Sequence, residues 1–181
     1  MAAVLCLWHL AFIQKKEWVM SLYEAIQTSY EEREARMALQ LSLLAQAAGN
    51  MASHFRHYLG LQTARWHHPD GKAGDDYIRL GTGSAKSFEE KSWMTLSSRN
   101  GVVPFSLAVT IVSEDRMFRT NYVFEMTVSF IIDGYLFTLE EGEEELVSVE
   151  YVKANNFDPV HKMLSARLMN VLDPSKIMIK N

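Results

Sequence analysis

Two stretches of sequence decide the fold, FSLAVTI at residues 105–111 and YVFEMTVSF at residues 122–130. Large apolar side chains occupy every second position in both stretches, and mostly small or polar side chains stand between them. Successive side chains of a β-strand point to opposite faces of the sheet, so this alternation is typical of strands with one buried face. The pattern predicts that Phe124, Val128 and Phe130 are buried against the long helix and that Thr127 and Ser129 lie on the opposite face.

Turn-forming residue pairs stand on both sides of these two strands. Asn100-Gly101 follows an apolar run at residues 93–97, and Asp133-Gly134 precedes another at residues 135–139. Asn, Asp and Gly tolerate the positive φ that the central positions of the tightest hairpin turns require. Both pairs are therefore predicted to close antiparallel hairpins. The sheet is expected to occupy residues 93–153 as an antiparallel meander of about five strands.

The first third of the chain predicts a long amphipathic helix over residues 21–59. Ser21 and Glu24 have the spacing of a capping box, which marks a helix start. Beyond it, apolar side chains recur at spacings of three and four, the period of one helix face. This apolar seam consists of Met37, Leu41, Leu44, Ala48, Met51, Phe55 and Tyr58, and a weaker upstream stripe consists of Leu22, Ile26 and Tyr30.

The length of this helix raises the question of what covers its apolar seam. About 39 helical residues would extend roughly 58 Å, more than the diameter of a domain of this size. A break at Gly49-Asn50, with the helix lying on its own sheet, is the simpler expectation. The alternative is a homodimer in which the long helix packs on its own image in a second copy. The apolar run from Leu5 to Ile13 is a further candidate cover within the same chain.

The order of the predicted elements gives the fold class. Residues 60–92 are expected to be a connecting loop region, and Asp158-Pro159 begins a C-terminal helix over residues 158–172. Helix, strands and helix in this order predict an α+β fold, with both helices packed on one face of the antiparallel meander. The whole chain, residues 1–181, is expected to be a single domain with residues 1–20 as an N-terminal extension.

Composition and cysteine usage narrow the class of protein. Hydrophobic residues make up 48% of the chain and charged residues 22%, values typical of a globular protein. A net charge of -4 argues against a nucleic-acid partner, whose binding surface is normally basic. Cys6 is the only cysteine, so we expect a reducing compartment and a cytoplasmic location. The apolar run at residues 2–13 is too short to span a bilayer, so no membrane partner is expected.

Histidine clustering offers one candidate site. His54 and His57 are three positions apart on the predicted helix, and His67 and His68 follow in the connecting region, near Asp75-Asp76. Imidazole pairs at this spacing can share a metal ion, and a metal with an open coordination position can activate water. The four histidines are therefore candidate metal ligands of a metal-dependent hydrolase. The alternative is that His54 and His57 favour the helix C-terminus electrostatically.

Other catalytic patterns are weak. Residues 81–87, GTGSAKS, lack the glycine expected before the lysine of a phosphate-binding loop, and no nucleophile elbow is present. No catalytic residue and no cofactor are predicted.

The candidate ligand-binding residues are Phe124, Glu125 and Tyr135, because Glu125 is the one charge inside a strongly apolar, aromatic strand region. The leading hypothesis is a non-enzymatic binding protein that contacts another protein or an apolar small ligand.

Overall fold

The computed structural model describes residues 21–176, which form an α+β fold as the sequence predicts. The chain divides into two compact units, Met1–Arg36 and Met37–Asn181. The predicted N-terminal extension, residues 1–20, lies outside the described residues, and the assignment of the chain to a single domain stays a prediction.

Helix α1 (Leu22–Tyr58) has the predicted bounds to within one residue at each end, and it starts with the predicted capping box. The Ser21 backbone N–H donates to Glu24 Oε2 at 2.7 Å, and the Glu24 N–H donates to Ser21 Oγ at 3.2 Å. These hydrogen bonds from Ser21 lower the pKa of the Glu24 carboxyl. Two backbone donors of the first turn thereby gain acceptors, which fixes the helix start.

The expected break at Gly49-Asn50 is wrong, because α1 continues through this pair without interruption. A Cβ atom added to Gly49 would lie 2.8 Å from Cβ and Cγ of Trp93, so only glycine allows this contact. Asn50 Nδ2 donates to Asn155 Oδ1 at 2.9 Å. The glycine is therefore required by packing, and it does not end the helix.

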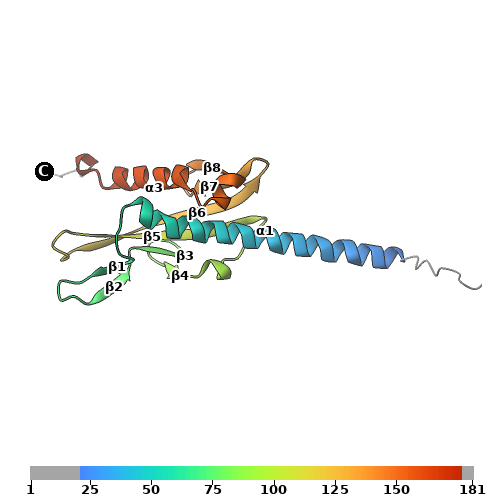
Figure 1. Cartoon of the computed structure of the whole chain (residues 1–181), viewed down its shortest axis with the longest axis horizontal. Coiled ribbons are helices and arrows are strands. Elements are labelled where there is room, and N and C mark those ends of the chain that lie inside the picture. Colours follow the sequence, from blue (N-terminus) through green and yellow to red (C-terminus); the bar gives the residue numbers. More distant parts are fainter. Residues whose placement is uncertain (1–20, 177–181) are drawn as a thin grey trace, which may run out of the picture. The chain divides into compact units, whose positions relative to one another are not determined.

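A six-stranded antiparallel sheet has the order β4-β3-β5-β6-β7-β8. Strands β5 to β8 form most of the predicted meander, and β3 and β4 extend it at the β5 edge (Figure 1). The sheet ends at Ser148 and not at residue 153, because residues 149–153 are helical. The strands are β3 (Ile78–Thr82), β4 (Glu89–Glu90), β5 (Val102–Val112), β6 (Arg119–Ile131), β7 (Gly134–Leu139) and β8 (Glu144–Ser148).

The prediction of a connecting loop over residues 60–92 is wrong, because this region contains four strands. Besides β3 and β4, it forms a separate two-stranded sheet from β1 (Arg65–His67) and β2 (Ala73–Asp76). Each of these strands is five residues or shorter, and period-two alternation does not accumulate over so few positions. Trp66 of β1 is only 2% exposed, and the local sequence pattern did not indicate that this side chain is buried.

Residues 93–97 do not form the predicted strand either, because residues 93–95 form a short 3₁₀ helix, η1 (Trp93–Thr95). Ser92 Oγ accepts from the Met94 N–H at its start. The turn after it is confirmed: Asn100 and Gly101 have φ values of 52° and 79°, and Arg99 bridges Val102 in antiparallel fashion. The turn predicted at Asn100-Gly101 therefore forms, although the strand predicted before it does not.

The second predicted hairpin forms one residue earlier than expected. Ile131 pairs with Gly134, so Ile132 and Asp133 make the turn and Gly134 is the first residue of β7. Gly134 has φ 152°, and a Cβ atom there would lie 2.3 Å from the Val147 carbonyl oxygen. The glycine is needed for close approach to β8, which explains why it stands beside the turn.

The sheet has an inner face that packs on the helices and an outer face. Alternation along β6 is confirmed, with Phe124, Met126 and Val128 buried on the inner face and Thr127 and Ser129 half-buried on the outer one. Phe130, near the end of the strand, is only partly buried against the core, so its predicted burial is incomplete. The core is completed by Leu44, Ala48, Met51 and Phe55 of α1 and by Val160, Leu164 and Leu168 of α3 (Asp158–Val171). Figure 1 shows α3 beside β8, and the short helix α2 (Val149–Lys153) connects these two elements.

Helix α3 has the predicted bounds to within one residue, but its start differs in detail. Asp158 is the first helical residue and does not cap it. Asn156 Oδ1 accepts from the Asp158 N–H at 3.1 Å, and Pro159 stands in the first turn. A short 3₁₀ helix, η2 (Pro174–Lys176), follows α3.

Candidate functional site

The outer face of the sheet is covered at one end by aromatic side chains. A Cβ atom on Gly81 would lie 2.7 Å from the Phe88 ring, and the Arg79 guanidinium carbon lies 5.5 Å from that ring's centroid. The Arg119 guanidinium carbon lies 5.1 Å from the centroid of the Trp66 ring. Beneath this layer Ser106, Ala108 and Thr110 of β5 are all buried.

In the covered part of the outer face, the Asp75 carboxylate pairs with two arginines. Asp75 Oδ2 lies 3.8 Å from Nη1 of Arg79 and 4.0 Å from Nη1 of Arg119. Trp66 Nε1 and Arg79 Nε are buried without a hydrogen-bond partner among residues 21–176. The aromatic and guanidinium groups therefore form a packed layer between the β1–β2 hairpin and the sheet.

The other end of the outer face is open and forms a hollow of about 660 Å³. Cross-strand pairing places Ser106 opposite Glu125 and Thr127 opposite Thr138, so all four lie on this face. The Ser106 hydroxyl donates to the Gly83 carbonyl oxygen at 2.7 Å. The polar residues around the hollow are Thr82, Lys91, Ser97, Arg99, Ser106, Glu125, Thr127, Thr138 and Glu140.

The charges around this hollow are only partly paired. Lys91 Nζ lies 3.2 Å from Glu89 Oε2. Within the described part of the chain, no ion pair or side-chain hydrogen bond engages Glu125, Arg99 or Glu140. The half-buried Glu125 carboxylate and the exposed Arg99 guanidinium are therefore available to a ligand.

The structure separates the three predicted ligand-binding residues. Glu125 faces the hollow, whereas Phe124 and Tyr135 are buried on the inner face among the core side chains. The Tyr135 ring lies 4.6 Å from that of Phe130, and burial raises the pKa of the Tyr135 hydroxyl. Phe124 and Tyr135 thus stabilise the fold. Phe124 also lines, with Glu125, a smaller hollow of about 170 Å³, whereas Glu125 alone of the three lines the larger one.

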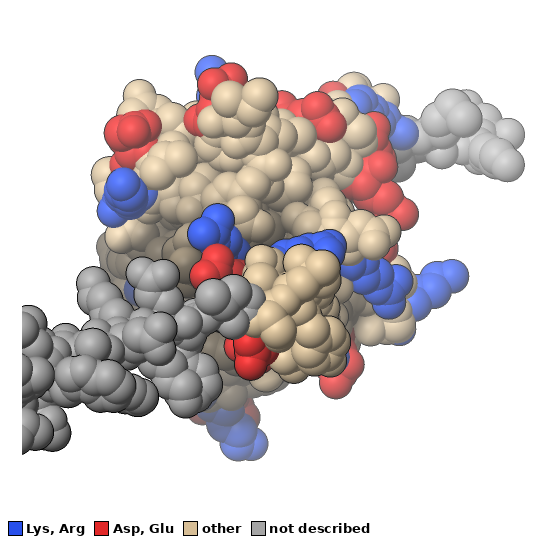
Figure 2. Space-filling view, turned by 90° about the vertical axis from the view of Figure 1, so that its right-hand side faces the viewer, with Lys and Arg blue, Asp and Glu red and all other residues tan. Residues whose placement is uncertain are grey.

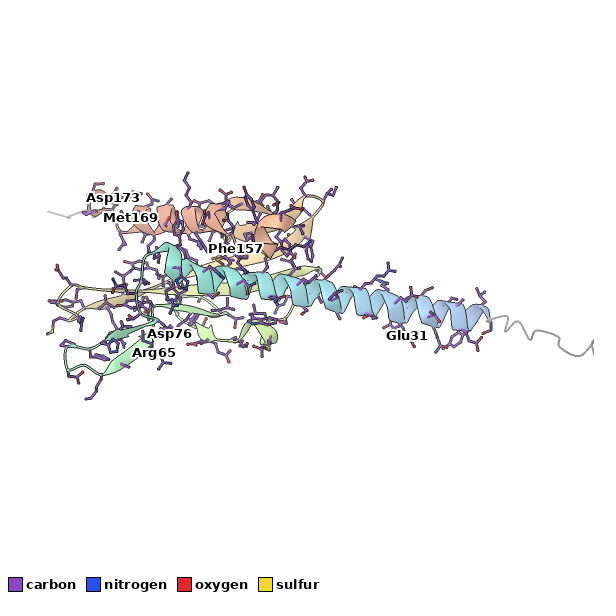
Figure 3. All side chains as sticks on the ribbon, in the orientation of Figure 1. Glu31, Arg65, Asp76, Phe157, Met169 and Asp173 are labelled. Carbon is purple, nitrogen blue, oxygen red and sulfur yellow. The ribbon has the colours of Figure 1, made fainter. Side chains whose placement is uncertain are left out.

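Two of the four predicted metal ligands lie together. The His54 and His57 rings are 6.3 Å apart, and both line a hollow of about 320 Å³ with Asp76. His54 Nδ1 lies 2.9 Å from the Asn50 carbonyl oxygen, so this nitrogen is a donor to the backbone. Asp76 Oδ1 accepts from Arg65 Nε at 2.9 Å (Figure 3). One ring nitrogen of His54 and one carboxylate oxygen of Asp76 are therefore already engaged with protein groups.

His67 and His68 do not complete a metal site with them. His67 ends β1, and the His68 ring lies 4.2 Å from the Trp66 ring. Across residues 21–176, no three histidine, cysteine, aspartate or glutamate side chains come close enough to hold one metal ion. The spacing in the sequence indicated a cluster that the fold distributes over α1 and the β1–β2 hairpin.

A fifth histidine, His161, was not singled out by the sequence. It is 2% exposed, and its Nε2 lies 3.0 Å from the Met51 carbonyl oxygen, to which it donates. The rings of Phe55 and Tyr58 lie 5.3 and 5.2 Å away. Burial lowers the pKa of His161, and the Met51 hydrogen bond and the Asp158 charge partly oppose this. His161 thus joins α3 to α1 as a neutral, structural side chain.

The upstream stripe of α1 is the second candidate surface. Leu22, Ile26 and Tyr30 are 79%, 57% and 61% exposed, and they recur every four residues. Glu31, labelled in Figure 3, begins the charged run EEREAR that follows them. Large apolar side chains at this spacing form one face of a helix without a partner among the described residues.

Charged side chains of both signs are dispersed over the surface that Figure 2 shows, with Lys and Arg among Asp and Glu. None of the helices within residues 21–176 combines the length and the apolar character that crossing a membrane requires.

Comparison with known proteins gave no relatives: no family model, no curated protein and no solved structure matches this chain.

Proposed function

We propose that this protein is a non-enzymatic binding protein that associates through the upstream stripe of α1, and that the partner is a second copy of the chain. The observation that carries the proposal is the exposure of Leu22, Ile26 and Tyr30 at helical spacing. Covering a side chain of this size is worth about 1.5 to 3 kcal/mol, so three such groups are a substantial driving force.

The charges after the stripe favour self-association. The run from Glu31 to Arg36 holds three glutamates and two arginines. In a symmetric dimer the same surface patch of each copy faces its image, so an antiparallel contact brings glutamates of one helix near arginines of the other. The Glu32–Arg36 pair, 4.0 Å apart and highly exposed, contributes little within one helix and is free to exchange partners.

The compartment follows from cysteine usage. With Cys6 as the one cysteine of the chain, we expect the dimer to form in a reducing compartment such as the cytoplasm, without an intramolecular disulfide.

Light scattering on the full chain tests the dimer. We expect a wild-type dimer, and we expect Ile26→Glu with Tyr30→Glu to give a monomer with unchanged circular dichroism, because both side chains are exposed within one chain. The matched control is Thr28→Glu with Ala35→Glu, which adds the same charge on the opposite side of the helix and leaves the dimer intact.

A wild-type monomer at roughly 100 µM, a concentration that populates any dimer with micromolar affinity, contradicts the proposal. A dimer that survives the Ile26 and Tyr30 substitutions contradicts it equally, because the contact then lies elsewhere.

A further inference from the structure

The hollow on the open part of the outer sheet face has the size of a ligand site. Its volume of about 660 Å³ falls within the range of roughly 300 to 1,000 Å³ that small-molecule sites occupy. Its floor is the outer face of β6 and β7, where Thr127 stands opposite Thr138. Strand residues hold these hydroxyl groups in fixed positions, which is what a preformed site requires.

The lining of the hollow holds unpaired charges of both signs. Lys91 is paired with Glu89, whereas Arg99, Glu125 and Glu140 have no ion pair within the described residues. A simple anion would match Arg99 and be repelled by the two carboxylates, and a simple cation would do the reverse. A ligand that carries one charge of each sign matches both groups, provided that its charges are far enough apart.

The register of the sheet gives that separation. Arg99 bridges Val102, Val102 pairs with Ser129, and Ser129 is four residues along β6 from Glu125. At about 3.3 Å per strand residue, the offset along the strands is roughly 13 Å, and Arg99 also lies two strand spacings of about 4.8 Å to the side of β6. The backbone positions of Arg99 and Glu125 are therefore roughly 16 Å apart. The long Arg99 side chain shortens the distance between the charged groups. An extended chain of three residues spans about 10 Å, and a single amino acid is too short.

From this geometry we infer that the hollow binds a short peptide of about three residues with free termini. The peptide ammonium group lies at Glu125 and its terminal carboxylate at Arg99. Thr127 stands midway between them on the same face and can hydrogen-bond a peptide amide. The Arg99 guanidinium is suited to bidentate contact with a carboxylate. The site lies in the unit Met37–Asn181 and is independent of the upstream stripe.

Titration of the full chain with trialanine, followed by amide NMR, tests this site. We expect shifts at the amides of Gly83, Thr127 and Thr138, around the hollow. Glu125→Gln and Arg99→Gln are each expected to weaken binding about three- to tenfold, the range for a charge-assisted contact that is partly exposed to water. The matched controls are Glu114→Gln and Arg116→Gln, both exposed in the turn between β5 and β6.

Capped peptides assign each terminus to its residue. N-acetyl-trialanine lacks the ammonium group, so Glu125→Gln should weaken trialanine binding and leave the binding of the acetylated peptide unchanged. Trialanine amide lacks the carboxylate, so Arg99→Gln should leave its binding unchanged. The inference is overturned if trialanine shifts none of these amides at about 10 mM, a concentration above any millimolar dissociation constant. It is also overturned if both capped peptides bind as tightly as trialanine.

Discussion

The upstream stripe of α1 and the middle of its apolar seam have the same sequence pattern and opposite surroundings. Leu22, Ile26 and Tyr30 are each more than half exposed, whereas Met51 and Phe55 are 0% exposed. Both sets recur at helical spacing, and both contain large apolar side chains. Periodicity therefore shows which face of a helix is apolar, and only the tertiary structure shows whether the same chain covers it.

The largest expected difference between the two sets is in stability. Phe55→Ala should lower the free energy of unfolding by roughly 3 to 5 kcal/mol, because it leaves a cavity among α1, α3 and the sheet. Tyr30→Ala should change it by less than about 0.5 kcal/mol when the protein is dilute enough to be monomeric. Urea unfolding followed by circular dichroism measures both. Equal losses for the two variants would remove the distinction between the buried and the exposed set.

Gly49 allows a second test inside the buried part of α1. Alanine is favoured over glycine in a helix by about 1 kcal/mol, so an uncovered helix would be stabilised by Gly49→Ala. Here the new Cβ lies 2.8 Å from the Trp93 side chain, and we expect a net loss of roughly 1 to 3 kcal/mol.

The contact with Trp93 is isolated by a double-mutant cycle. Trp93→Ala should remove most of the penalty of Gly49→Ala, since the clashing ring is gone. Gln46→Ala, at an exposed position of the same helix, is the matched control and should have little effect. Stabilisation by Gly49→Ala alone would show that the ring does not pack on this glycine.

The sequence was sufficient for the elements that are long and regular. Strands β5 and β6 have eleven and thirteen residues, and their alternation predicted the face that packs on the helices. It did not predict that the other face of β5 is buried as well, at Ser106, Ala108 and Thr110. The sequence did not predict β1 to β4, because these strands have only two to five residues and depend on Trp66 and Phe88 for burial. At Gly49 a residue that disfavours helix was read as a break, because the partner that requires it, Trp93, is distant in sequence.

The candidate sites were less predictable than the fold, because each depends on several elements. Glu125 was identified as an unusual charge in an apolar strand, and it does face a hollow. Its predicted companions Phe124 and Tyr135 point to the other face, as period-two alternation required for Phe124. Arg99 was not identified at all, since its position beside the hollow depends on the turn at Asn100-Gly101 and on η1.

His161 connects the buried part of α1 to α3 and makes the stability of that contact depend on pH. Its pKa is lowered in the folded protein, so the unfolded chain binds more protons below the ordinary histidine pKa of about 6.5. The stability that the neutral ring contributes is fully present above about pH 6.5 and is lost as the pH falls toward the folded pKa.

His161→Gln should flatten this part of the profile, because an amide can donate to the Met51 carbonyl oxygen without taking up a proton. Unfolding free energies measured between pH 7 and about pH 5 give the comparison. His67→Gln, at an exposed position of β1, is the matched control and should follow the wild type. A His161→Gln profile with the wild-type slope would mean that other groups cause the pH dependence.

The smallest expected effect is at the start of the exposed part of α1, where no core packing supports the helix. Within the described residues, the capping box supplies the only side-chain acceptors for the backbone N–H groups at this helix start, so Ser21→Ala should fray the first turn. We expect hydrogen-exchange protection of the Ala25 amide to fall about two- to tenfold, while the amides around Met51 keep theirs.

The effect of this substitution should depend on pH. Because the pKa of Glu24 is lowered in the helix, the stability that its carboxylate contributes is present above the ordinary carboxyl pKa and is lost as the pH falls through the folded pKa. The difference between Ser21→Ala and wild type should therefore shrink toward about pH 3. Thr28→Ala, which removes a hydroxyl that donates to the Glu24 carbonyl oxygen, is the matched control and should leave the protection of Ala25 unchanged. Equal loss of protection at Ala25 and Met51 would mean that the two parts of the helix open together, and the contrast between them would then be one of exposure alone.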